Sequence, residues 1–213
     1  MDTFDLYKDI QCRTNGEIYL GVVGPVRSGK STFIKRFMDV LVLPKMTDEH
    51  AKERTVDELP QSASGKSIMT TEPKFVPKEA AEIQLAKDVS VLVRLIDCVG
   101  YMVEGAAGHM ENGAERLVKT PWNEKEIPFT KAAEIGTKKV IHDHSTIGIV
   151  VTTDGSIGEL PRNSYRAAEK KTIQELKSIG KPFVVLVNTR KPYSAEAKNV
   201  AERISGNGTS GQL

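Results

Sequence analysis

"GVVGPVRSGKST", residues 21–32, matches the pattern GxxxxGK[ST] without a mismatch. The run Ile18 to Val23 overlaps its start, is apolar and partly β-branched, and predicts a short buried strand. Apolar residues then recur at helical spacing and predict a helix with one apolar stripe, made of Phe33, Ile34, Phe37, Met38 and Leu41. Strand, glycine-rich turn and helix therefore follow in the order that a phosphate-binding loop requires.

This loop offers the groups that the tail of a nucleoside triphosphate needs. Its glycines let backbone N–H groups turn inward around phosphates, and the helix that follows adds its positive end. Lys30 would reach the terminal phosphates, and Ser31 would offer its hydroxyl to Mg²⁺. We therefore predict a nucleotide site whose loop residues are Gly24, Arg27, Ser28, Gly29, Lys30, Ser31 and Thr32.

A second polar group follows the next apolar run. Val89 to Ile96 predicts a strand that ends at Asp97, and Gly100 completes the sequence "DCVG". A carboxylate at the carboxyl end of a strand beside the loop can hold Mg²⁺ through water, while the Gly100 amide can meet a γ-phosphate. The alternative is a simple strand-ending turn, because Asp and Gly are common in turns.

Two threonines lie between the loop and Asp97, in "GKSIMTTEP". Thr70 or Thr71 could close on the metal and the γ-phosphate when a triphosphate is bound and move away after hydrolysis. The alternative is a β-branched pair that enters a strand. The sequence does not separate the two threonines.

The rest of the chain predicts one α/β domain with a mostly parallel sheet and helices on both faces. Further strands are expected at Ile147 to Val151 and at Phe183 to Val187, the latter ending at Asn188. A helix capped by Asn163 or Ser164 and a last helix ending near Ile204 follow these strands. We expect the domain to cover residues 1–204 and residues 205–213, "SGNGTSGQL", to be a flexible tail or linker sequence.

Two segments show no sustained periodicity. Met46 to Ser67 is polar and charged, and predicts a surface loop. Tyr101 to Phe129 contains scattered Gly and Pro residues and predicts a long irregular connection, of the kind that is often functional.

Composition limits the classes of partner. A net charge of +2 gives no bulk electrostatic case for nucleic acid, and no apolar run approaches the length of about 20 residues that crosses a bilayer. The two cysteines form no CxxC motif, which suits a reducing cytosol. His142 and His144 could be metal ligands, but the end of an exposed helix is the simpler interpretation.

The order of these motifs resembles that of translation-factor-related GTPases, whose last motif is NKxD. This chain has "NTRK", which begins at Asn188, and we predict that Asn188 also contacts the nucleotide. Lys191 stands where an acidic side chain would accept hydrogen bonds from guanine. Lysine only donates, and we therefore predict that ATP binds at least as well as GTP. Tyr101 stands where many such enzymes place the glutamine that orients water, which predicts slow hydrolysis.

A closer resemblance rests on longer stretches, including "LPQSASGKSIMTTEPKFVP", "RLIDCVGYMV" and "AAEIGTKKVIHDHSTIGIVVTTDGSIGELPR". The chain resembles the N-terminal nucleotidase domain of the stage IV sporulation protein A family, the coat morphogenesis ATPases of endospore-forming bacteria. By motif, Lys30 and Ser31 match the Walker A pair, Thr70 and Thr71 the sensor threonines, and Asp97 the Walker B carboxylate.

This resemblance implies Mg²⁺-dependent ATP hydrolysis in the mother-cell cytoplasm. It also implies self-association of the full-length protein into a layer on the outer forespore surface, to which other spore coat morphogenetic proteins attach. Contact with the forespore membrane would be indirect, and no nucleic acid is expected. The resemblance further implies that the family's middle and C-terminal domains lie outside this chain, and we expect the last strand and helix of a complete nucleotidase fold to lie outside it as well.

Two alternatives to an ATPase remain. The chain could be a structural scaffold that binds nucleotide without meaningful turnover, which Tyr101 favours. It could also be a GTPase in ribosome assembly, which Lys191 and the nearly neutral net charge oppose.

Overall fold

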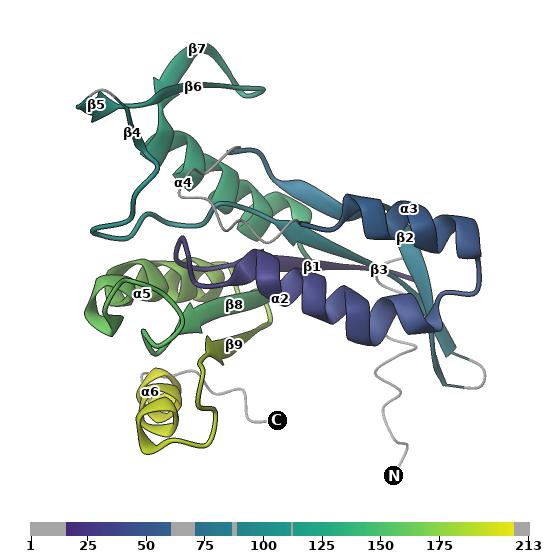
Figure 1. Ribbon diagram of the computed structural model, residues 1–213. Helices are drawn as coiled ribbons and strands as arrows, with labels where there is room; N and C mark the ends of the chain where they lie inside the picture. The colour runs from purple at the N-terminus through teal and green to yellow at the C-terminus, as the bar shows by residue number, and fades with distance from the viewer. Residues whose placement is uncertain (1–15, 61–70, 87–88, 112, 207–213) are drawn as a thin grey trace.

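The computed structural model describes residues 16–60, 71–86, 89–111 and 113–206, and it shows an α/β fold around a five-stranded sheet (Figure 1). The strand order is β2-β3-β1-β8-β9, and only β2 runs antiparallel to its neighbour. The strands are β1 (Glu17–Val23), β2 (Lys74–Ala86), β3 (Val89–Asp97), β8 (Ile147–Thr153) and β9 (Phe183–Asn188). The predicted mostly parallel sheet is confirmed, and β2 is a strand that the sequence analysis did not predict.

The register of the sheet brings the ends of four strands together. Val22 of β1 lies opposite Asp97 of β3, and Val23 lies opposite Val150 of β8. Thr153 of β8 in turn lies opposite Asn188 of β9. Because these strands are parallel, the loops that follow them meet at one edge of the sheet, where ligands of open α/β sheets bind.

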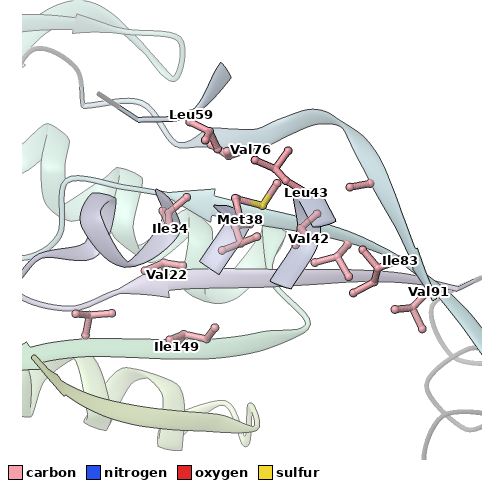
Figure 2. Packing of buried hydrophobic residues seen from close by; sticks show 14 residues of the cluster. Val22, Ile34, Met38, Val42, Leu43, Leu59, Val76, Ile83, Val91 and Ile149 are labelled. Carbon is pink, nitrogen blue, oxygen red and sulfur yellow. The ribbon is translucent and has the colours of Figure 1, made fainter. Parts of the chain in front are cut away.

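One face of the sheet is covered by α2 (Lys30–Phe37) and the turns that continue it, η1 (Met38–Val42) and η2 (Leu43–Lys45). Figure 2 shows Ile34 and Met38 packed near Val22 of β1, in a cluster that also holds Val76 of β2. The predicted helix after the loop is confirmed, but its last apolar position is wrong. η1 is a π-helical turn, which shifts the register so that Val42 is buried and Leu41 is 44% exposed.

The opposite face is covered by α4 (Phe129–Lys139), η3 (Val140–His144) and α5 (Arg162–Ser178). Val23 points to this face because consecutive strand residues alternate, and it shares a cluster with Ile141 and Tyr165. Helices therefore lie on both faces, as predicted. The last helix, α6 (Ala195–Gly206), contacts β9.

The predicted cap of α5 is wrong. The residue before the helix is Pro161, and Ser164 donates its N–H to the Pro161 carbonyl, so both candidate caps lie inside the first turn. Extended backbone at Pro161, with ψ near 156°, sets the boundary two or three residues earlier than the polar residues indicated.

The predicted loop from Met46 to Ser67 contains a helix, α3 (Glu49–Glu58), and residues 61–67 lie outside the described residues. Asp48 caps α3 by accepting hydrogen bonds from the His50 and Ala51 N–H groups, at 2.9 and 3.1 Å. Thr55 is buried in α3, which packs on β2. The helix was missed because it buries a single short polar side chain and so shows little apolar periodicity.

The irregular connection predicted from Tyr101 to Phe129 contains two hairpins. They are formed by β4 (Met110–Glu111) with β5 (Ala114–Glu115) and by β6 (Leu117–Thr120) with β7 (Asn123–Pro128), and they project next to α4 (Figure 1). Their side chains are mostly exposed, so the alternation that reveals a half-buried strand is weak. No helix among the described residues has both the length and the apolar character needed to span a membrane.

Candidate phosphate-binding site

The loop between β1 and α2 makes a tight turn that ends at Gly29. Gly29 has φ +93° and immediately precedes the helix, whose first bond runs from Phe33 N–H to the Gly29 carbonyl at 2.9 Å. The positive φ favours glycine here, and a Cβ at Gly29 would in addition displace the Asn188 side-chain amide. Arg27 also has positive φ, at +59°, and its side chain is exposed.

Lys30 is the first residue of α2, and its side chain reaches back to the loop. Its side chain is buried, with 5% of the residue exposed, and its ammonium donates to the Pro25 carbonyl at 2.6 Å. Burial lowers the pKa of Lys30, while Cys98 and Asp97 oppose the shift. An anion bound in the loop would stabilise the charged ammonium, so the site is electrostatically suited to phosphate.

Asp97 and Ser31 form the part of the site that suits a cation. The Ser31 hydroxyl donates to Asp97 Oδ2 at 2.9 Å, while Asp97 Oδ1 is buried and has no hydrogen-bond partner among the described residues. Burial raises the pKa of Asp97, and the nearby Lys30 ammonium opposes that shift. A hydroxyl and a carboxylate oxygen are ligands that Mg²⁺ accepts, and it commonly completes its shell with water and phosphate. The two residues therefore fit Mg²⁺.

The segment after β3 is hydrogen-bonded to the phosphate loop. Val26 donates its N–H to the Tyr101 carbonyl at 2.8 Å, and Tyr101 donates its N–H to the Gly24 carbonyl at 3.2 Å. Gly100 has φ +94°, and a Cβ there would lie 2.7 Å from the Lys30 ammonium nitrogen. Gly100 therefore borders the space that a terminal phosphate on Lys30 would occupy.

Tyr101 is buried in the core on the side of α4 and α5. The residue is 3% exposed, the Lys171 ammonium lies 4.6 Å from the ring centroid, and the hydroxyl has no hydrogen-bond partner among the described residues. Burial, followed by the charges of Glu175 and Glu134, raises the pKa of Tyr101. In this conformation the side chain packs in the core, and the backbone is hydrogen-bonded to the phosphate loop.

Asn188 contacts the loop from the other side. Its side-chain amide donates to the Ser28 carbonyl at 3.3 Å. Ser28 is fully buried, and its hydroxyl is without a hydrogen-bond partner in the described part of the chain. Thr32 is exposed on the first turn of α2, outside this arrangement.

Of the two predicted sensor threonines, the structure describes only Thr71. Thr70 lies outside the described residues, whereas Thr71 is 5% exposed. A Cβ on Gly136 of α4 would lie 2.5 Å from the Thr71 carbonyl, so the absence of a side chain at Gly136 lets this segment rest against the helix. Sequence reasoning missed Gly136, although a glycine inside the helical stretch "AAEIGTKK" usually has a packing reason.

Several other polar residues have structural partners. Cys98 is buried and free, and burial raises its pKa to about 11, which does not suit a nucleophile. His142 lies 2.8 Å from Glu175, and His144 packs against the Phe75 ring. Among the described residues no three His, Cys, Asp or Glu side chains gather into a metal cluster.

The comparison with known proteins identifies the family. The model of the ATPase domain of stage IV sporulation protein A matches residues 1–209. The chain belongs to the stage IV sporulation protein A family. It is 53% identical over 205 residues to a stage IV sporulation protein A from Bacillus anthracis, and 60% identical over 192 residues to one from Clostridioides difficile (strain 630). A third member of the stage IV sporulation protein A family, from Bacillus subtilis (strain 168), is 53% identical over 205 residues.

These alignments cover 96%, 90% and 96% of this chain but only 42%, 39% and 42% of the relatives, respectively. The chain therefore spans about two fifths of the length of these stage IV sporulation proteins A. The family resemblance seen in the sequence is confirmed, and the matching domain is named an ATPase. The comparisons support a nucleotide-binding role in sporulation.

Proposed function

We propose that this chain binds Mg²⁺-ATP in a P-loop NTPase fold and hydrolyses it slowly. The observation that carries the proposal is the pairing of the Ser31 hydroxyl with Asp97, beside a lysine buried in a glycine-rich loop. A buried ammonium and a buried carboxylate oxygen that has no partner among the described residues, beside a glycine-rich loop, together suit a polyphosphate with its metal ion.

Each residue would have a distinct role. Lys30 would exchange its bond to the Pro25 carbonyl for one to the terminal phosphates, and Ser31 and Asp97 would hold Mg²⁺. Bound Mg²⁺ would supply neutralisation of the phosphate charge. The Gly100 amide would meet the γ-phosphate, and Thr71 or Thr70 would respond to its loss.

The wider role extends beyond the described residues. We propose that hydrolysis drives self-assembly of the full-length protein into a spore coat basement layer on the forespore surface, in the mother-cell cytoplasm. Other coat morphogenetic proteins would attach to this layer. This part of the proposal rests on family membership. The chain itself covers only about two fifths of the length of these relatives.

Single-turnover phosphate release tests the enzymatic proposal. With the protein in excess over Mg²⁺-ATP, we expect slow release by the wild-type chain and a loss of roughly 100-fold or more in Lys30→Ala. Lys35→Ala is the matched control, because Lys35 is an exposed lysine on the same helix. Equal rates in wild type and Lys30→Ala would contradict hydrolysis at this site.

A nucleotide-binding scaffold is the second candidate. It is favoured by Tyr101, which stands at the sequence position of the water-orienting glutamine. The Tyr101 side chain lies in the core, so it does not take over that role in this conformation. A scaffold would bind ATP and return it intact in the same assay. Phosphate release that depends on Lys30 would exclude it.

A further inference from the structure

Asp154 lies in the turn after β8, and its neighbours in space follow β9. Thr153 and Asn188 are opposite each other at the ends of these two strands, so the turns that continue them meet. The sequence "TTDG" is typical of an ordinary turn. Asp154 is not among the residues to which the proposed hydrolysis assigns a role.

The carboxylate is the acceptor at the centre of a small network. Asp154 Oδ1 accepts from the Ser156 backbone N–H at 2.9 Å and from the Ser156 hydroxyl at 2.6 Å. Asp154 Oδ2 accepts from the Thr189 hydroxyl at 2.5 Å. Both oxygens are therefore used, and each hydroxyl has its proton directed at the carboxylate.

The two hydroxyls also form hydrogen bonds with the backbone of the turn after β9. Because their protons point at Asp154, their lone pairs are free to accept. The Ser156 hydroxyl accepts from the Arg190 backbone N–H at 2.9 Å, and the Thr189 hydroxyl accepts from the Lys191 backbone N–H at 3.1 Å. The backbone of residues 189–191 is thus held in place from the β8 side.

This turn borders the phosphate loop on the side opposite to the metal residues. Asn188, which begins the turn, donates to the Ser28 carbonyl, and a Cβ at Gly29 would lie 3.5 Å from Ile157 Cδ1. The sheet order places Asp97 on β3, on one side of the loop, and the β8 and β9 turns on the other. A triphosphate whose tail reaches Lys30 and Asp97 would therefore direct its nucleoside toward residues 189–191.

We propose that Asp154 is a positioning residue for the nucleoside part of the bound nucleotide, acting through Ser156 and Thr189 on the backbone of residues 189–191. This inference rests on the proposed function, because it assumes that the loop binds a triphosphate tail. Burial raises the pKa of Asp154, but the hydrogen bonds from Ser156 and Thr189 outweigh it and keep the pKa low. The group is thus a carboxylate at neutral pH, able to accept at both oxygens.

Two ligands separate this role from general stability. Mg²⁺-ATP has a nucleoside and Mg²⁺-tripolyphosphate has none, so only the affinity for ATP should depend on the turn at residues 189–191. Asp154→Asn keeps the size of the side chain but turns one acceptor into a donor. Thr189→Val removes the same link from the other end, without a change of charge. Glu159→Gln is the control, since it removes an exposed carboxylate from the same loop.

By calorimetry we expect Asp154→Asn and Thr189→Val to raise the Kd for Mg²⁺-ATP about tenfold, with the Kd for Mg²⁺-tripolyphosphate within about twofold of wild type. Glu159→Gln should change neither value. Circular dichroism establishes that each variant is folded, and either link variant alone suffices for the test.

Equal weakening of both ligands, or unchanged ATP affinity in both link variants, would overturn the role of Asp154. Failure of the wild-type chain to bind either ligand is a different result. It would contradict the proposed function, and the role of Asp154 would fall with it.

Discussion

Asp97 illustrates a conflict between stability and function at a single residue. Its carboxyl group is buried beside Lys30, and burial raises its pKa in spite of that neighbour. Compared with the unfolded chain, the folded state therefore shifts the equilibrium of Asp97 toward its protonated form. The stability that Asp97 contributes is greatest at low pH and is lost as pH rises through its folded pKa.

We predict that Asp97→Asn stabilises the nucleotide-free chain at pH 7 by about 3 °C in Tm, because asparagine avoids the cost of the buried charge. The gain should shrink as pH falls and Asp97 becomes protonated. The same variant should lose Mg²⁺-dependent hydrolysis. Thermal melts between pH 4 and pH 8 measure the effect, with Asp57→Asn on exposed α3 as control. A less stable variant at pH 7 would refute this account.

Lys191 decides the choice of base in the nucleotide proposal. Its backbone N–H donates a hydrogen bond to the Thr189 hydroxyl. In sequence, Lys191 stands at the position of the acidic residue in the NKxD motif of guanine-specific GTPases. We predict that Lys191→Asp shifts the ratio of GTP to ATP affinity about tenfold toward GTP, because a carboxylate can accept two hydrogen bonds from the guanine edge. Lys191→Ala separates the loss of a cation from the gain of an acceptor. Competition between the two nucleotides measures the ratio, and an unchanged ratio in Lys191→Asp would argue against a base at this position.

Among the elements, α5 contains a buried ion pair that is also hydrogen-bonded to β8. Arg162 contacts both oxygens of Glu169 at 2.7 Å, and Thr152 of β8 donates to the same carboxylate at 2.5 Å. The Glu169 side chain is only 9% exposed. Removal of the arginine would therefore leave a buried charge with a single hydroxyl partner.

We predict that Arg162→Ala lowers the free energy of unfolding by about 3 kcal/mol. Arg166→Ala, an exposed arginine one turn further along α5, should change it by less than about 0.5 kcal/mol. Urea denaturation compares the two variants. Similar losses in both would mean that helix propensity or surface charge, and not the pair with Glu169, sets the stability.

The elements that the sequence predicted share one property, which is a clear apolar period. β1, β3, β8 and β9 are apolar runs, and α2 and α5 carry stripes that face the sheet. α3 and the β6–β7 hairpin were missed because their order comes from the Asp48 cap, from contact with β2 and from strand pairing. The cap and the hairpin pairing add no apolar period, and the contact with β2 depends on residues distant in sequence, so a search for apolar periods finds neither element.

The same distinction applies to the candidate site. The motif spacing was enough to group Lys30, Ser31, Asp97 and Gly100, because a phosphate loop and the end of the neighbouring strand lie together in this sheet order. The burial of Tyr101, the contact between Thr71 and Gly136, and the network around Asp154 could not be predicted. They depend on how α4, α5 and two turns pack in space.

At the scale of the whole molecule, β9 has a neighbour on one side only among the described strands. Val184 and Leu186 lie on one face of this strand and are 38% and 36% exposed. We propose that in a longer chain a further strand pairs with the free edge of β9 and a further helix covers this face. Hydrogen exchange should then show β9 amides at least tenfold more protected in a longer chain than in the 213-residue chain. Equal exchange in both would contradict the proposal.

Calorimetric binding of Mg²⁺-ATP tests the central claim most directly, because every role above depends on the loop around Lys30. We predict saturable binding by the folded wild-type chain, weakened roughly 10- to 100-fold in Lys30→Ala and unaffected in Lys35→Ala. A folded wild-type chain that takes up no nucleoside triphosphate in the presence of Mg²⁺, or that binds as well without the Lys30 ammonium, would contradict the account.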